Sequence, residues 1–121
     1  MFTLAAVMFG VTALGGITAA TLHLRHTPPP LWLGRVHGAA ALASIIVLAI
    51  GVGQKAQSNW AEASYATGAL TMFFVAAVMG RILFIFHARK GVVPKVMIVL
   101  HATAAVTGLA LLLFEIASDV A

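Results

Sequence analysis

The chain has 121 residues, of which 62% are hydrophobic and only 8% are charged, and its net charge is +4. A soluble domain usually carries about 25% charged residues. The composition therefore excludes a soluble enzyme, a disordered tail and a nucleic-acid-binding protein, and it predicts one transmembrane domain over residues 1–121 in contact with a lipid bilayer. The chain contains no cysteine, which excludes disulfides, thiolate metal sites, iron–sulfur clusters and thioether-linked haem.

Four apolar segments are each long enough to cross a hydrocarbon core of about 30 Å as a helix. They cover about residues 2–24, 31–53, 63–87 and 96–117. Prolines at 28–30 separate the first two segments, and residues 91–94, which include Gly91 and Pro94, separate the last two. Proline is tolerated at the start of a helix but not inside it. The sequence therefore predicts an all-α membrane protein with four transmembrane helices.

Positively charged residues flank the first and third predicted loops. They are Arg25, Arg35, Arg89, Lys90 and Lys95. Because cytoplasmic loops carry an excess of Lys and Arg, we expect both loops on the cytoplasmic side, with the two termini and the middle loop on the outer side. The expected location is a bacterial inner membrane, which the chain crosses several times. Near the middle loop, we expect Lys55 to be balanced by Glu62.

The chain repeats itself at an offset of 64 residues. Without a gap, 14 of the 46 pairs from Thr3/Thr67 to Leu48/Leu112 are identical. The identities include one Arg pair, one Pro pair and two His pairs, which alanine-rich composition would not readily supply. The repeat predicts an up-down four-helix bundle built from two parallel two-helix repeats, related by a pseudo-two-fold axis along the membrane normal. The two repeats cover about residues 1–56 and 65–120.

The repeat singles out four histidines in the cytoplasmic half of the bundle. His23 is equivalent to His87, and His37 to His101, with the second pair about 5 Å deeper at 1.5 Å per residue. A small residue lies seven positions from each histidine, on the same helix face and toward the membrane centre. These small residues are Gly16, Gly80, Ser44 and Gly108. We interpret the row of small residues as room for a flat, wide ligand.

A structural explanation of the histidines is that they join closely packed helices by hydrogen bonds. Polar groups inside apolar helices are costly, however, and are usually functional. We therefore favour one or two haem b groups held by pairs of axial imidazoles, with His37 and His101 as the preferred pair. His23 and His87 are candidates for a second haem, for propionates or for a quinone. A cross-pairing of His23 with His101 and of His37 with His87 also respects the symmetry.

Four arginines are candidate partners for haem propionates. Arg25, Arg35 and Arg89 lie at the predicted cytoplasmic end of the bundle. Arg81 lies inside the third segment, six residues before His87, and its repeat equivalent is Ile17. An intramembrane arginine faces the bundle interior or extends to the interface. In the first case Arg81 would contact a propionate or a quinone oxygen.

The chain resembles the b561-type cytochromes and related quinone-linked cytochromes b. The resemblance covers the whole chain as architecture and includes the two histidine-bearing helix starts, RVHGAAALASI and VLHATAAVTGL. It implies bis-histidine haem b that passes electrons between quinols, small donors or partner proteins. Family members that carry electrons across the bilayer hold haems near both faces, whereas no histidine of this chain lies in the predicted outer half. We therefore expect a redox site on one side, or a haem-bearing subunit of a larger membrane complex.

Two alternatives remain open at this point. Imidazole also suits copper and zinc, so the four histidines are candidate ligands of a bare metal ion. The second alternative is that the chain is a non-catalytic assembly subunit of a membrane complex.

Overall fold

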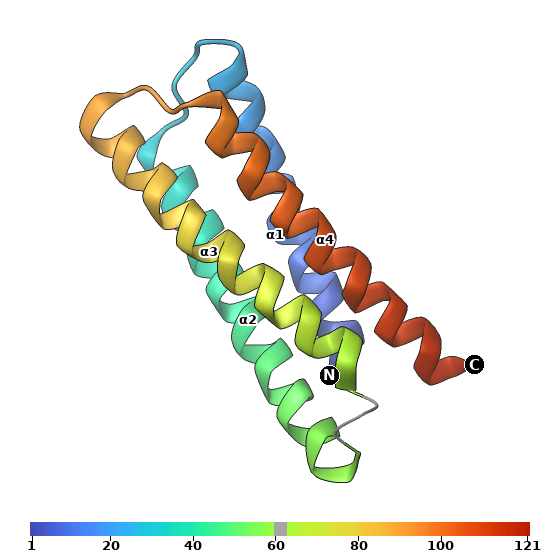
Figure 1. The fold of residues 1–121 in the computed structure, drawn as a ribbon. Coiled ribbons are helices and arrows are strands. Elements are labelled where there is room, and N and C mark those ends of the chain that lie inside the picture. The colour runs from blue at the N-terminus through green and yellow to red at the C-terminus, as the bar shows by residue number, and fades with distance from the viewer. Residues whose placement is uncertain (60–62) are drawn as a thin grey trace.

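The computed structural model describes residues 1–59 and 63–121, and this part of the chain forms four long helices joined by short connections (Figure 1). The helices are α1 (Phe2–Leu24), α2 (Leu31–Ser58), α3 (Ser64–Lys90) and α4 (Lys95–Val120). Each is long and apolar enough to cross a membrane, so the prediction of an all-helical chain with four such helices is confirmed. α1 has the predicted bounds, whereas α2, α3 and α4 each continue about three to five residues beyond the predicted ends of their apolar segments.

Proline and glycine set the boundaries between the helices. Pro30 and Pro94 cap the N-termini of α2 and α4 with extended ψ angles of 143° and 127°. Their missing amide hydrogens cost nothing at a helix start. Gly91 ends α3 in the left-handed region, at φ 66°, where a side chain would be strained.

The four helices pack around one common axis. The most extensive contacts join α1 with α2 and α3 with α4, and smaller contacts join α2 with α3 and α1 with α4. α1 therefore lies diagonally opposite α3, and α2 opposite α4. The loops at residues 25–30 and 91–94 lie at one end of the molecule, called here the loop end, while both termini lie toward the other, called the terminal end (Figure 1).

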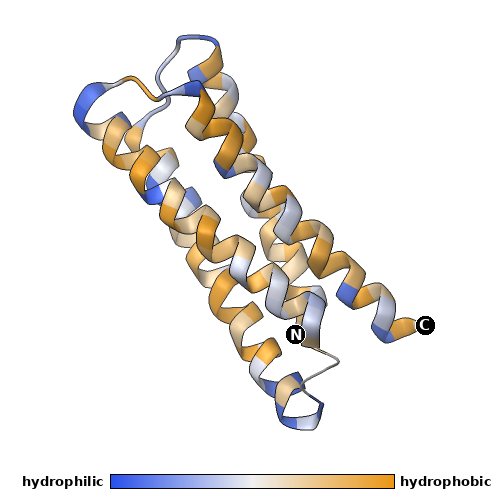
Figure 2. Ribbon diagram, viewed as in Figure 1, coloured by the Kyte–Doolittle hydropathy of each residue, from blue (hydrophilic) through white to orange (hydrophobic). Residues whose placement is uncertain are grey.

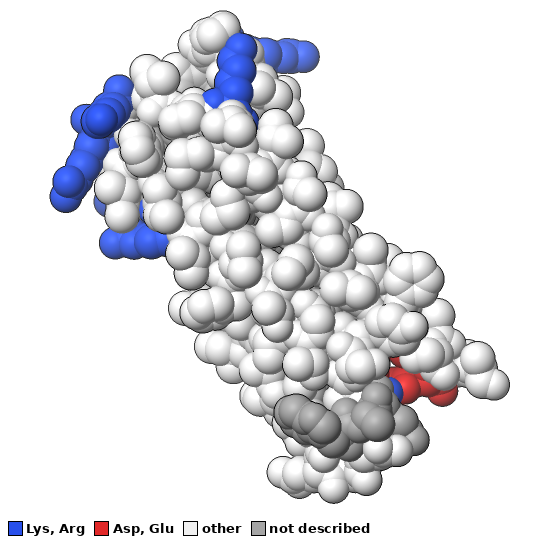
Figure 3. All heavy atoms as spheres, viewed as in Figure 1, with Lys and Arg blue, Asp and Glu red and all other residues white. Residues whose placement is uncertain are grey.

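Apolar residues predominate along most of the length of the helices (Figure 2). Large apolar side chains are exposed on every helix, among them Leu14 (65%), Leu42 (59%), Phe74 (64%) and Phe114 (63%). An apolar surface of this extent matches lipid rather than water. Most Lys and Arg side chains gather at the loop end, and the visible Asp and Glu side chains lie at the terminal end (Figure 3).

The terminal half of the bundle contains a close-packed core. At its centre the rings of Phe9 and Phe73 stack with their centroids 3.6 Å apart and their planes 3° from parallel. The rest of this core consists of Ala5, Leu48, Val52, Ala66, Ala69 and Leu112. Such cores are packed as densely as organic crystals and have no room for a ligand. Any ligand inside the bundle must therefore bind in the loop half.

A buried carboxylate ties three helices together at the terminal end. Glu115 on α4 is fully buried, and its carboxylate accepts hydrogen bonds from the backbone N–H of Ala66 (2.9 Å) and from Nζ of Lys55 (2.5 Å). Lys55 also donates to Asp119. The Ala66 amide belongs to the first turn of α3, where backbone N–H groups have no partner inside the helix. Glu62, the partner we expected for Lys55, lies outside the described residues, and the structure pairs Lys55 with Glu115 and Asp119.

Replacing Lys55 should destabilise the bundle. Removing one partner of a buried ion pair costs about 3–5 kcal/mol, and because the Lys55 side chain is 15% exposed we expect Lys55→Met to lower the free energy of unfolding by about 2 kcal/mol. Denaturation by sodium dodecyl sulfate in mixed micelles, followed by circular dichroism, measures the change. Lys95→Met, at an exposed position at the loop end, is the matched control. Equal stability of Lys55→Met and wild type would contradict the assignment, as would full additivity with Glu115→Gln.

Candidate cofactor site

A cavity of about 450 Å³ lies in the loop half of the bundle. All four helices contribute to its wall, which includes several small residues, among them Gly16 on α1, Gly34 on α2 and Gly80 on α3. Sites for organic ligands typically have volumes of about 300–1,000 Å³. The cavity also receives all four histidines that the repeat singles out, as well as Arg35 and Arg81.

The inner pair of histidines, His37 and His101, is held by backbone carbonyl groups of neighbouring helices. Each is the seventh residue of its helix, α2 or α4. Nδ1 of His37 lies 3.0 Å from the carbonyl oxygen of Thr12 on α1, and Nδ1 of His101 lies 2.8 Å from that of Ala76 on α3. The two contacts are equivalent under the 64-residue offset. Each ring is therefore fixed across a helix–helix interface.

These hydrogen bonds decide which ring nitrogen of the inner pair carries the proton. A carbonyl oxygen only accepts, so Nδ1 of His37 and of His101 must be the donor. In a neutral imidazole the other nitrogen, Nε2, then keeps its lone pair. Metal-ligating histidines almost always donate their second ring N–H to a carbonyl or carboxylate in this way. The inner pair thus presents two oriented Nε2 lone pairs.

The distance between the inner rings matches two ligands on opposite sides of one metal ion. The ring centroids of His37 and His101 lie 6.3 Å apart, with an interplanar angle of 75°. A ligating imidazole nitrogen lies about 2.0 Å from a first-row metal and about 1.2 Å from the centre of its own ring, so two trans ligands have centres about 6.4 Å apart. The centroid separation of the two rings therefore equals that of two imidazoles bound to one metal ion.

Two glycines make the approach of the inner rings possible. A Cβ atom at Gly16 would lie 2.9 Å from Cε1 of His37, and one at Gly80 would lie 3.1 Å from Cε1 of His101. Each glycine is four residues after the carbonyl that holds the ring, so it lies one turn above that oxygen on the same helix face. The space at these two positions, which we predicted for a flat ligand, is thus occupied by a histidine ring of the neighbouring helix.

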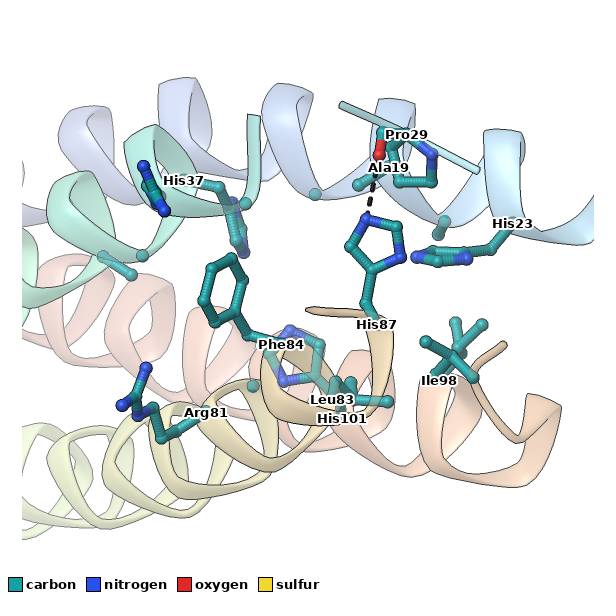
Figure 4. A pocket seen from close by; sticks show the side chains of 18 of the residues that line it. Ala19, His23, Pro29, His37, Arg81, Leu83, Phe84, His87, Ile98 and His101 are labelled. Atoms are coloured by element: carbon teal, nitrogen blue, oxygen red, sulfur yellow. Dashed lines mark hydrogen bonds between the residues drawn. The ribbon is translucent and has the colours of Figure 1, made fainter. Parts of the chain in front are cut away.

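The outer pair, His23 and His87, has a different geometry (Figure 4). Its ring centroids lie 4.8 Å apart and the rings are perpendicular, at 89°. Nε2 of His87 donates to the carbonyl oxygen of Pro29, 2.9 Å away in the first loop. The opposite nitrogen, Nδ1, is buried and has no hydrogen-bond partner. The ring centroids of His23 and His87 are closer together than those of two imidazoles bound on opposite sides of one metal ion.

The remaining residues predicted from the sequence lie in two groups. Arg81 lines the cavity from α3 but is exposed, with its guanidinium carbon 5.9 Å from the ring centroid of Phe84. The others lie outside the described cavity wall: Arg25, Arg89, Ser44 and Gly108. Arg25 and Arg89 are exposed, Ser44 is buried and its hydroxyl donates to Ala40, and Gly108 packs against the ring of Phe73. Their roles as cofactor contacts stay predictions.

Sequence reasoning missed two features of the cavity. The first is the carbonyl of Pro29, which fixes the tautomer of His87. The second is Phe84, a large side chain on the wall, whose ring lies where a Cβ at Gly34 would come within 2.9 Å. The glycine three residues before His37 is the signal that could have indicated a bulky neighbour at this position.

No protein-family model, curated protein or solved structure matches this chain.

Gly16→Ala should displace the ring of His37, because its new methyl group would lie 2.9 Å from Cε1. Overpacking costs about 1–3 kcal/mol, and we expect a loss of stability in that range in sodium dodecyl sulfate denaturation. Gly10→Ala on the same helix is the matched control, since nothing lies within 4 Å of its Cβ. This control should be neutral or stabilising, by up to about 1 kcal/mol. The same response from both variants would show that Gly16 does not accommodate the ring.

Proposed function

We propose that this protein is a membrane-embedded b-type cytochrome that holds haem b between His37 and His101 and transfers electrons. The observation that carries the proposal is the inner pair of imidazoles, held by carbonyl groups through Nδ1, with ring centroids 6.3 Å apart. The donor set fits the group, because two neutral imidazole nitrogens are the axial ligands of a low-spin, six-coordinate haem.

The cavity supports the proposal through its shape and charge. Small residues in its wall would leave room for a flat macrocycle beside the two rings. Arg35 and Arg81 line the same cavity, and their guanidinium groups suit the negatively charged propionates. When bound, haem b supplies a one-electron couple. The chain contributes the ligands, their orientation and a surrounding of low polarity, which are the features that set the potential.

The arrangement in the membrane is part of the same proposal. The protein is an up-down bundle of two duplicated helix pairs in a bacterial inner membrane, with the loop end in the cytoplasm and both termini outside. The concentration of basic residues at the loop end (Figure 3) supports this orientation. The equivalent contacts of His37 and His101, and the stacking of Phe9 on its repeat equivalent Phe73, support the duplication.

Electrons would be exchanged with a quinone or quinol in the bilayer, or with a redox partner protein in a larger membrane complex. The cavity lies at one end of the bundle, and a close-packed core fills the other half. This supports a redox site on one side of the membrane. A second haem on His23 and His87 is less well supported, because the outer rings are closer together than trans ligands.

A bare copper or zinc ion on the histidines is the alternative. Structural zinc usually takes four protein ligands. Within residues 1–59 and 63–121, no group of three or more His, Cys, Asp or Glu side chains is placed to hold a metal ion. Haem needs only the two axial nitrogens and is the better match.

Replacing either inner histidine should remove the haem. We expect His37→Ala and His101→Ala each to abolish the sharp reduced alpha band and to lower the haem-to-protein ratio in a pyridine haemochrome assay. His26→Ala is the matched control, because His26 is exposed in the first loop, outside the described cavity wall. A colourless wild-type protein that binds copper or zinc stoichiometrically would instead favour the bare metal site, and unchanged spectra in both variants would remove the inner pair as ligands.

A further inference from the structure

Two arginines lie on the outward-facing part of the cavity wall, between α2 and α3. Arg35 of α2 and Arg81 of α3 both line the cavity, and both are exposed. A Cβ atom at Gly34 would lie 2.9 Å from the ring of Phe84, so these two residues are at the same level of the bundle. Arg35 and Arg81 therefore lie within about one helical turn of each other along the bundle, at 5.4 Å per turn.

The 64-residue offset shows what the equivalent positions carry on the opposite side of the bundle. Arg35 is equivalent to Val99 on α4. Arg81 is equivalent to Ile17 on α1, and α1 also packs against α4. Val99 and Ile17 are 60% and 62% exposed, as apolar side chains in contact with hydrocarbon are expected to be. The α2–α3 side therefore differs from its equivalent by two positive charges, and both lie beside the same cavity.

Neither arginine has an anionic partner among the described residues. In the part of the chain that the structure describes, the side-chain carboxylates are those of Glu115 and Asp119, and both bind Lys55 at the terminal end. Arg81 lies nine residues before the end of α3, about 14 Å along the helix. An arginine inside an apolar span is costly and usually pairs or extends to the interface. An anion from outside the chain would supply the missing charge.

We propose that the α2–α3 side binds an anionic phospholipid, whose phosphate is held by Arg35 and Arg81. Guanidinium groups bind phosphate oxygens through paired N–H···O hydrogen bonds. The face of α2 that carries Arg35 continues toward the membrane centre with Gly38, Ala39 and Leu42, which line the cavity and are exposed. This apolar face offers a surface for the acyl chain of the same lipid.

The charge of the site selects among phospholipids. A zwitterionic headgroup would bring an ammonium group close to two guanidinium groups, with no described carboxylate nearby to receive it. The headgroup of phosphatidylglycerol carries a net negative charge and no cation, so it complements the two arginines. Figure 4 shows Arg81 at the end of the cavity away from His23 and His87, so this site is distinct from the outer pair of histidines. Because each guanidinium has five N–H donors, a phosphate outside does not prevent its contact with a haem propionate inside.

Native mass spectrometry of the full chain released from detergent micelles tests the proposal. The purified protein is titrated with phosphatidylglycerol or phosphatidylcholine of identical acyl chains, and the fraction of lipid-bound protein gives each dissociation constant. We expect phosphatidylglycerol to bind about tenfold more tightly, as two basic residues beside one anionic headgroup imply. Equal affinities of the two lipids for the wild-type protein would overturn the proposal, whatever the behaviour of any variant.

Variants assign the preference to the two arginines. Arg35→Val combined with Arg81→Ile installs the residues of the equivalent positions and should reduce the preference to about twofold or less. Lys90→Met combined with Lys95→Met is the matched control, because it removes two exposed charges at the loop end that lie outside the described cavity wall. This control should keep the tenfold preference. An equal loss in both double variants would overturn the site, because general surface charge would then explain the selectivity.

Two further measurements separate the lipid site from haem and from free anions. Haem adds its own mass, so haem-loaded and haem-free molecules are resolved in one spectrum, and both should prefer phosphatidylglycerol. A preference confined to haem-free molecules would overturn the site, since the arginines would then bind the propionates alone. A protein that never contains haem but keeps the preference would refute the cytochrome and support the lipid site. Displacement of the lipid by excess inorganic phosphate would overturn the choice of a lipid over a free anion.

Discussion

The structure depends on one constraint, which is that imidazoles inside an apolar bundle must find their hydrogen-bond partners within the protein. Lipid offers no donor or acceptor, so each unsatisfied polar group is costly. His37 and His101 meet this constraint by donating to main-chain oxygens of neighbouring helices. A main-chain oxygen in a helix is held rigidly by its own turn. The rings are therefore fixed in place and in tautomer, and each keeps a lone pair on Nε2.

The two halves of the bundle differ in how densely they are packed. At the terminal end, stacked phenylalanine rings and small residues give dense packing, and the carboxylate of Glu115 joins Lys55 on α2 to the first turn of α3. At the loop end, glycine and alanine keep the helices from filling the space between them. The packed half supplies the stability that allows the other half to remain hollow. This division explains how so small a chain can carry both a core and a cavity.

The helices could be predicted from the sequence because hydropathy and proline act locally. The four histidines and the glycines at 16 and 80 could also be singled out, since repetition preserves spacing. The hydrogen-bond and ion-pair partners of these side chains could not be predicted. Which carbonyl meets His37 depends on the rotation of two helices about their axes, and the pattern of residues does not specify that angle. Lys55 and Glu115 are 60 positions apart, so local charge counting favoured Glu62 instead. Ser44 and Gly108 have the correct spacing, yet they belong to the packed half.

The contact between Pro29 and His87 has a consequence for the loop that joins α1 and α2. A backbone oxygen outside any helix determines the protonation pattern of a ring on α3, an element that this loop does not connect. The length and path of the loop are therefore part of the chemistry of the cavity. Inserting one residue between Thr27 and Pro28 would remove no side chain of the site, yet it would displace that oxygen and let the ring turn. The path of this connecting segment therefore helps to determine which ring nitrogen of His87 carries the proton.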